Sequence, residues 1–286
     1  MTDTPPESLT PDEAFALVGH ETRVAILQAV VDAAREADDP FASVGFSELR
    51  ERVGMRDSGG FNYHLGKLVG PFLEHDEEGY RPRYTTLLVV GAILSGVYTE
   101  QGSAEPVAVD TPCPICDGVI EATYERERAV VACTDCGETF YSSAVPPGAL
   151  EGYDTSEYPD VFARWTSRLM AEMRSGFCLA CLGRVDTEVR PEGGEPVVHY
   201  RCRRCPERSR TSVAAALLDH PAMVSFHWDH GIDVREVVAW ALPWLHGDTT
   251  LVSEDPLRAE CTAELGGETL TLTVDGTLSV LVVERS

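Results

Sequence analysis

The fold of the N-terminal third is decided by two neighbouring stretches, Ser47-Glu-Leu-Arg-Glu-Arg-Val53 and Phe61-Asn-Tyr-His-Leu-Gly-Lys-Leu68. The first has the pattern of a short helix, with Ser47 placed to accept hydrogen bonds from the free N–H groups of the first turn. Gly54 follows, and a glycine at this position commonly ends a helix. The sequence therefore predicts a helix, a tight turn and a second helix.

The second helix is expected to begin near Ser58 and to have one buried and one exposed face. Its apolar residues recur at helical spacing and form one stripe: Phe61, Leu65 and Leu68. Asn62, Tyr63 and Lys67 then face outward, as on a helix that enters the major groove of DNA. At the start of the helix, the small residues Ser58, Gly59 and Gly60 would leave N–H groups open to a phosphate.

A β-hairpin is predicted directly after this helix. Its strands are residues 72–75 and 80–84, and Asp76-Glu-Glu-Gly79 connects them. The two-residue period of a strand places Arg81 and Arg83 on one face, where they would contact DNA phosphates. Together with the two helices, the hairpin completes the layout of a winged helix-turn-helix.

This region resembles the ArsR-like winged helix-turn-helix regulators in the form common among halophilic archaea. The resemblance is carried by Leu17-Val-Gly-His-Glu-Thr-Arg-Val-Ala-Ile-Leu27, the second helix and the hairpin, and it covers residues 1–100. It implies sequence-specific binding of DNA, usually as a dimer, but not metal sensing, because no cysteine precedes Cys113. The expected DNA contacts are Arg56, Ser58, Gly59, Asn62, Tyr63, Lys67, Arg81 and Arg83. A winged helix that contacts only protein is the alternative.

The charge of the chain opposes DNA binding in dilute buffer. Its 286 residues include 47 acidic and 23 basic side chains, a net charge of −24, and Lys67 is the only lysine. Such a composition suits molar intracellular salt, where the screening length falls to about 3 Å and long-range repulsion of DNA disappears. Attraction to phosphate also weakens there, so binding would depend on direct contacts and shape.

Other features of the sequence concern location and assembly. No apolar run approaches the length of a membrane span, and the polar, acidic N-terminus is unlike a signal peptide. We therefore expect a cytoplasmic protein. The apolar segment 87–94 either packs on its own helices or forms the two-fold seam of a dimer, and we favour the seam.

Eight of the nine cysteines form four Cys-x-x-Cys pairs: Cys113/Cys116, Cys133/Cys136, Cys178/Cys181 and Cys202/Cys205. The spacing within each half suits a hairpin that returns the second pair to the first, which predicts two zinc ribbons with four thiolate ligands each. Gly118, Gly137 and Gly183 are expected where the turns need a relaxed backbone. Pro206 departs from the pattern, because it removes a backbone donor that often bonds a sulfur in such a site.

Other interpretations of the cysteines stay open. Iron in a rubredoxin-like site uses similar turns, and the pairs could be crossed between ribbons, although zinc and pairing within each ribbon are favoured. Because four cysteines leave no open coordination position, we expect a structural role and no enzyme activity. Residues 177–210 hold seven arginines and five acids. This excess fits either a second nucleic-acid contact or ion pairs within the fold, and the ion pairs are favoured.

The remaining segments have structural patterns. Residues 156–176 carry apolar side chains at helical spacing, and a helix is expected from His220, with a break at Gly231 and a new cap at Asp233 and Glu236. Three histidines near these segments are expected to be structural rather than metal ligands: His199, His227 and His230. The region from residue 106 onward resembles an uncharacterised module that accompanies these archaeal winged helices.

The C-terminus is predicted to be an antiparallel β-meander with Cys261 in its core. Two-residue turns are expected at Gly266-Gly267 and Asp275-Gly276. The apolar residues that alternate along its strands are Ala259, Cys261, Ala263 and Leu265, then Leu270, Leu272 and Val274, then Leu278, Val280 and Val282.

The sequence thus predicts an α+β multidomain chain. Its parts are a winged helix-turn-helix domain (1–100), zinc ribbon 1 (106–145), a connecting helix (146–176), zinc ribbon 2 (177–212) and a module of helices and β-meander (213–286). The expected function is that of a zinc-stabilised transcriptional regulator adapted to high salt. Its expected partners are double-stranded DNA, a second copy of the chain and the transcription machinery. The alternative is a zinc-ribbon adaptor whose winged helix contacts protein or RNA.

Overall fold

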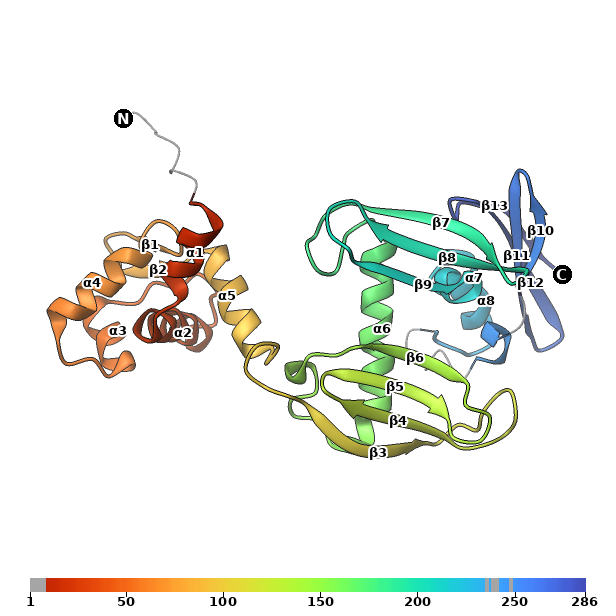
Figure 1. Cartoon of the computed structure of the whole chain (residues 1–286), viewed down its shortest axis with the longest axis horizontal. Coiled ribbons are helices and arrows are strands. Elements are labelled where there is room, and N and C mark those ends of the chain that lie inside the picture. Colours follow the sequence, from red (N-terminus) through yellow and green to blue (C-terminus); the bar gives the residue numbers. More distant parts are fainter. Residues whose placement is uncertain (1–8, 235–236, 238–241, 247–248) are drawn as a thin grey trace. The chain divides into compact units, whose positions relative to one another are not determined.

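The chain forms two units, Met1–Glu100 and Gln101–Ser286. They are seen in a computed structural model that describes residues 9–234, 237, 242–246 and 249–286 (Figure 1). The α+β class is confirmed. Helices and a hairpin form the first unit, whereas β-sheets with two four-cysteine clusters and a C-terminal β-meander form most of the second.

The first unit is a helical domain with a small hairpin. Its elements are α1 (Pro11–Val18), α2 (Glu21–Glu36), α3 (Phe46–Val53), α4 (Ser58–Leu68), β1 (Leu73–His75), β2 (Tyr80–Pro82) and α5 (Tyr84–Leu94). Ile26, Leu49 and Phe61 are fully buried where the helices meet. Within the described part of the chain, no single helix is long and apolar enough for a membrane span, and only the pair α1 and α2, bent by 80°, meets the length and composition criteria together.

Two expectations about the ends of elements in this unit are wrong. Helix α3 begins at Phe46 with Gly45 at the N-cap, so Ser47 lies inside the helix and does not cap it. Strand β2 ends at Pro82, because Arg83 is the N-cap of α5 and Tyr84 begins that helix. Arg83 therefore does not continue the hairpin as predicted.

Helix α5 contains the apolar segment 87–94, for which the sequence left two roles open. Thr86 and Val90 are buried against the rest of the unit. On other sides of the helix, Tyr84, Leu88 and Leu94 are 64%, 52% and 64% exposed. The helix therefore packs on its own unit and leaves further apolar side chains at the surface.

The described residues of the second unit form three antiparallel sheets. The first is β3 (Ser103–Val109), β4 (Ile120–Glu125), β5 (Arg128–Cys133) and β6 (Thr139–Ala144); the second is β7 (Val185–Glu192), β8 (Glu195–Cys202) and β9 (Arg208–Ser212); the third is β10 (Thr249–Glu254), β11 (Leu257–Leu265), β12 (Glu268–Asp275) and β13 (Val280–Arg285). In each sheet, strands that follow one another in the chain are also neighbours.

Helix α6 (Tyr158–Arg174) joins the two cysteine-bearing sheets. Near its start, Phe162 belongs to the apolar core of the first sheet, and near its end Met173 belongs to a core shared by the second sheet and the meander. The shorter helices among the described residues of this unit are η1 (Pro147–Ala149), η2 (Thr155–Glu157), α7 (Val213–Leu217), α8 (Pro221–Asp229) and η4 (Pro243–His246). Glu236, part of the predicted second cap, lies outside the described residues.

The meander agrees with its predicted alternation except near the end. Ala259, Cys261, Ala263, Leu270, Leu272 and Val274 are all buried, but Val282 is 45% exposed. The turn at Gly266-Gly267 is confirmed, with φ of 60° and 86°. The predicted two-residue turn at Asp275-Gly276 is wrong: the Asp275 carboxylate accepts hydrogen bonds from the N–H groups of Thr277 and Ser279 at 2.8 and 3.0 Å, and β13 begins only at Val280.

Candidate metal centres and winged-helix surface

The first sheet gathers Cys113, Cys116, Cys133 and Cys136 into one cluster. The sulfur of Cys113 lies 3.8 Å from that of Cys136, and the sulfur of Cys116 lies 3.6 Å from that of Cys133. These separations exclude disulfides, in which the sulfurs are about 2.05 Å apart. Four sulfurs at about 2.3 Å from a tetrahedral zinc ion would lie about 3.8 Å from one another. The cluster therefore fits a zinc ion.

The second sheet gathers Cys178, Cys181, Cys202 and Cys205 in the same way. The sulfurs of Cys178 and Cys205 are 3.6 Å apart, and those of Cys181 and Cys202 are 3.5 Å apart. In both clusters all ligand atoms lie within 4.8 Å of one another. The pairs thus combine within each ribbon, as favoured from the sequence, and are not crossed. His199 belongs to neither cluster, and its Nε2 lies 3.1 Å from the Glu192 carboxylate.

Each Cys-x-x-Cys pair forms a tight turn with a common hydrogen bond. The N–H of the first cysteine donates to a carbonyl five residues later: Cys113 to Gly118, Cys133 to Glu138, Cys178 to Gly183 and Cys202 to Glu207, at 2.8–3.0 Å. This bond closes the turn and directs both sulfurs to the same side. Local backbone geometry therefore arranges the two sulfurs of each pair.

The left-handed residue of three of these turns comes directly after the second cysteine. It is Asp117, Gly137 or Leu182, with φ of 58°, 77° and 56°. The sequence placed this conformation correctly at Gly137 but one residue too late at Gly118 and Gly183. Glycine is needed at those two positions for space, because a Cβ on Gly118 would collide with Asp135, and one on Gly183 would lie 3.1 Å from the Cys181 sulfur.

The fourth turn departs from the others at Pro206, but the donor lost there is not one that bonds a sulfur, which was the expectation from the sequence. In the other turns, the N–H at this position donates to the carbonyl of the first cysteine. Proline has no N–H to donate to the Cys202 carbonyl and cannot adopt a left-handed φ. The Cys202 sulfur nevertheless accepts hydrogen bonds from the N–H groups of Arg204 and Cys205 at 3.2 and 3.4 Å. The second cluster therefore keeps the donors that stabilise a metal-bound thiolate.

Helix α4 has the predicted division into two faces. Phe61, Leu65 and Leu68 are buried, whereas the polar residues are exposed: Asn62, Tyr63 and Lys67. The Lys67 ammonium lies 5.7 Å from the centre of the Tyr63 ring. Burial of one stripe leaves these three polar or aromatic side chains on the surface of the helix.

The N-terminus of α4 is not open to a phosphate in the expected way. The carboxylate of Asp57, which is the N-cap, accepts hydrogen bonds from the N–H groups of Gly59 and Gly60 at 3.0 and 3.1 Å. An aspartate just before Ser-Gly-Gly is a recognisable cap, and the sequence interpretation overlooked it. Ser58 and Arg56 lie exposed beside it.

The two arginines predicted to lie on the hairpin are already bonded within the unit. Arg81 contacts the Glu74 carboxylate through two nitrogens, at 2.8 and 2.6 Å, and Arg83 donates to the carbonyl of Gly70. Arg81 and Glu74 are register partners on β2 and β1, so only the strand pairing showed that they meet. The turn between the strands adds three exposed acidic residues: Asp76, Glu77 and Glu78.

Comparison with protein families identifies the part of the chain that holds both clusters. A family model described as "Domain of unknown function (DUF7351)" matches residues 110–280, more than half of the chain. The chain belongs to the DUF7351 family. A second family model, "Domain of unknown function (DUF7347)", matches residues 11–93, which contain the hairpin and nearly all of α1–α5. The comparisons with curated proteins and with solved structures found no match.

In the DUF7351 region, backbone hydrogen bonds and neighbouring sulfurs give the cysteines of one cluster different pKa values, as the first cluster shows. Hydrogen bonds from the N–H groups of Cys136 and Asp135 lower the pKa of Cys133 to about 7, against the effect of burial. For Cys116, a backbone hydrogen bond from Gly118 favours the thiolate, but the neighbouring sulfurs and burial raise the pKa to about 12. Four thiolates together thus require a cation among them.

Proposed function

We propose that this DUF7351 protein is a DNA-binding transcriptional regulator of the ArsR-like type, in which α4 enters the major groove. The observation that carries the proposal is the polar face of α4 over its buried stripe. Asn62 offers an amide that can bond an adenine edge through two hydrogen bonds, and Lys67 offers an ammonium for guanine or phosphate. Tyr63, 62% exposed, adds an amphipathic contact beside them.

The surroundings of α4 define the conditions for binding. Asp57 and the acidic wing turn, 76–78, repel phosphates, and Arg81 is neutralised by Glu74. Molar salt screens this repulsion beyond a few ångströms, whereas direct hydrogen bonds from α4 persist. We therefore propose that α4 rather than the wing supplies the contacts with bases, and that binding is specific only at high salt.

We further propose that two copies of the chain meet through the exposed apolar side chains of α5. Tyr84, Leu88 and Leu94 are each more than half exposed on a helix otherwise packed on its own unit. Burying them against a second copy removes apolar surface from water. A two-fold pair would present two α4 helices to half-sites one turn of DNA apart.

The two four-cysteine clusters are proposed to hold one zinc ion each. With four thiolates the ion has no open position for a substrate, so it supplies cross-linking of the fold rather than catalysis. We accordingly propose a cytoplasmic regulator, not an enzyme, with the second unit available for contact with the transcription machinery.

Selection of bound duplexes from a random library in molar potassium chloride tests the proposal. We expect one enriched motif, with its affinity lowered at least about tenfold by Asn62→Ala or Lys67→Gln. Arg35→Gln is the matched control, because that side chain is 76% exposed on a different helix, α2, where it pairs with Asp32. Failure to enrich any motif, or full affinity in both α4 variants, would contradict the proposal.

The acidic wing turn favours a second candidate, an adaptor whose winged helix contacts protein or RNA. Asp76, Glu77 and Glu78 are poor neighbours for DNA phosphates but suit a basic partner. Capture of partners from a lysate at matched salt separates the two functions. An adaptor keeps its partners when Asn62 is replaced by alanine and Arg83 by alanine, and it shows no discrete site on DNA.

A further inference from the structure

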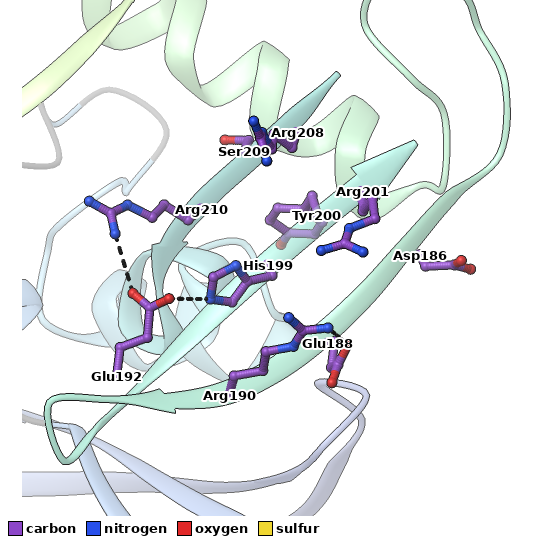
Figure 2. A pocket seen from close by; sticks show the side chains of 10 residues that line it. All are labelled: Asp186, Glu188, Arg190, Glu192, His199, Tyr200, Arg201, Arg208, Ser209 and Arg210. Carbon is purple, nitrogen blue, oxygen red and sulfur yellow. Dashed lines mark hydrogen bonds and ion pairs between the residues drawn. The ribbon is translucent and has the colours of Figure 1, made fainter. Parts of the chain in front are cut away.

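The sheet β7-β8-β9 has a hollow outer face lined by charged residues. The hollow measures about 580 Å³, within the range of about 300–1,000 Å³ typical of small-ligand sites. Val198, Tyr200 and Cys202 of β8 are buried, and the alternate residues His199 and Arg201 line the hollow (Figure 2). The face is therefore a polar surface of the sheet, opposite the apolar core that holds the second cluster.

The three carboxylates that line the hollow each bond an arginine other than Arg201 or Arg208. Glu188 pairs with Arg190 at 2.5 Å, and Asp186 pairs with Arg203 at 2.6 Å. Glu192 contacts both His199, at 3.1 Å, and Arg210, at 3.2 Å. The favoured expectation that the arginines of residues 177–210 pair with acids within the fold is thus correct for Arg190, Arg203 and Arg210.

Arg201 and Arg208 differ from these paired arginines. They are direct register partners on β8 and β9, so their side chains leave the same face of the sheet next to each other. Both are exposed, and within the described parts of the chain neither forms an ion pair. Figure 2 shows Glu192 joined to His199 and Arg210, and no dashed line reaches Arg201 or Arg208.

Two like charges opposite each other on neighbouring strands destabilise a sheet. Asp186 lies opposite Arg201 on β7, and the Arg201 charge helps to lower the pKa of Glu188, but these two acids bond Arg203 and Arg190. An anion between Arg201 and Arg208 would offset the repulsion that is left. A phosphate group matches this pair better than a carboxylate does. A carboxylate has two oxygens in one plane, which suit a bidentate contact with one guanidinium, whereas a phosphate has oxygens in several directions and more charge, which suit two guanidinium groups at once. The opening of the hollow to solvent leaves room for whatever carries the phosphate.

We propose that the hollow of the β7-β8-β9 sheet binds a phosphate group between Arg201 and Arg208. The group belongs either to a nucleic-acid backbone or to a free phosphate compound. The site lies in the second unit and does not require α4 to contact DNA. It gives the DUF7351 region a binding function of its own, in addition to the structural metal centres.

Titration of the full-length, zinc-loaded protein with inorganic phosphate tests the site. Arginine Nε–H and backbone amide signals are followed by NMR in molar potassium chloride, and then with adenosine monophosphate and a short oligothymidylate as probes. We expect the Nε–H signals of Arg201 and Arg208 to shift. The double variant Arg201→Gln/Arg208→Gln should lose at least about tenfold in affinity, as loss of hydrogen bonds to a charged group requires.

The control is Arg35→Gln/Arg126→Gln, which removes the same charge from side chains that are 76% and 83% exposed elsewhere. It should bind as the wild type does, and all variants should retain their zinc. Tighter binding of the oligonucleotide assigns the site to nucleic acid, and tighter binding of phosphate or the nucleotide assigns it to a free compound; both support the proposal. Absence of shifts with every probe, or undiminished binding by the double variant, overturns it. Asn62→Ala should leave these signals unchanged, which separates this test from that of DNA reading.

Discussion

The indole N–H of Trp244 donates a hydrogen bond to Nε2 of His227 across 3.0 Å. The other ring nitrogen, Nδ1, donates to the Met223 carbonyl at 2.7 Å, which fixes the tautomer with the proton on Nδ1. The ring is fully buried. His227 thus joins α8 to the η4 turn and, as the sequence predicted, is a satisfied structural residue.

Acidification is expected to destabilise the fold through His227. Burial lowers its pKa, the hydrogen bond to Met223 opposes this shift, and the charge of His230 adds to it. Because the neutral ring is the form that fits, its stabilisation is present above the unfolded pKa of about 6.5 and is lost as the pH falls below that value. Thermal unfolding from neutral pH to mildly acidic pH should show this loss.

The variant His227→Gln tests the assignment. The variant should be less stable than the wild type at neutral pH, but its stability should decrease less as the pH falls. Some dependence of stability on pH should persist in the variant, because burial, together with His20 and Arg23, lowers the pKa of His64 as well. Zinc content is measured at each pH so that loss of metal is recognised. Parallel slopes for variant and wild type would show that His227 does not titrate in this window.

Loss of a single cysteine should release one metal ion without affecting the other. Cys133→Ser removes a ligand of the first cluster and Cys202→Ser one of the second, and the two clusters share no residue. We expect elemental analysis to find two zinc ions in the wild type and one in each variant. Cys261→Ala is the control, because this buried cysteine lies in the meander and in neither cluster. Loss of both ions from one variant, or iron in place of zinc, would refute this expectation.

Leu182→Gly is expected to stabilise the second metal centre. Leu182 adopts φ of 56° and is 66% exposed, so its side chain carries the cost of a left-handed backbone and buries little surface in return. Glycine removes that cost but has more conformational freedom in the unfolded chain. We therefore expect the free energy of unfolding to rise by about 0.5–1 kcal/mol. Thermal unfolding of the zinc-loaded protein measures it.

Two companion variants sharpen this test. Leu182→Ala keeps the strained backbone and should bring no gain. Asp117→Gly should bring a smaller gain than Leu182→Gly, because aspartate tolerates the left-handed region better than leucine does. Equal gains from all three would show that backbone strain is not the cause.

Asp57 should influence stability and DNA affinity in separable ways. Asp57→Ala removes the cap of α4 and should cost about 1 kcal/mol in unfolding free energy. Asp57→Asn keeps one capping oxygen, for the N–H of Gly59 or Gly60, but removes a negative charge beside the proposed DNA contact. We expect near-normal stability and tighter binding of DNA for Asp57→Asn. Unchanged affinity in this variant would place the N-terminus of α4 away from the phosphates.

Patterns that repeat over a few residues were predictable from the sequence. The stripe of Phe61, Leu65 and Leu68, the turn at Gly266-Gly267 and the grouping of eight cysteines each follow from helical or strand periods and from short spacings. The errors lie at the ends of elements. Arg83 is the N-cap of α5 and does not continue the strand. The Asp275 carboxylate accepts hydrogen bonds from the N–H groups of Thr277 and Ser279, which makes the turn longer than the two residues expected for Asp-Gly.

By itself, the sequence determined the α+β class, the buried and exposed faces of α4 and the cysteine pairs, because periodicity and local turns are properties of neighbouring residues. Only the tertiary structure decided which charged side chains form ion pairs. Glu74 neutralises Arg81, while Arg201 and Arg208 stand side by side without an ion pair among the described residues. Strand register determines which side chains meet, and the members of both pairs become neighbours only when their strands pair.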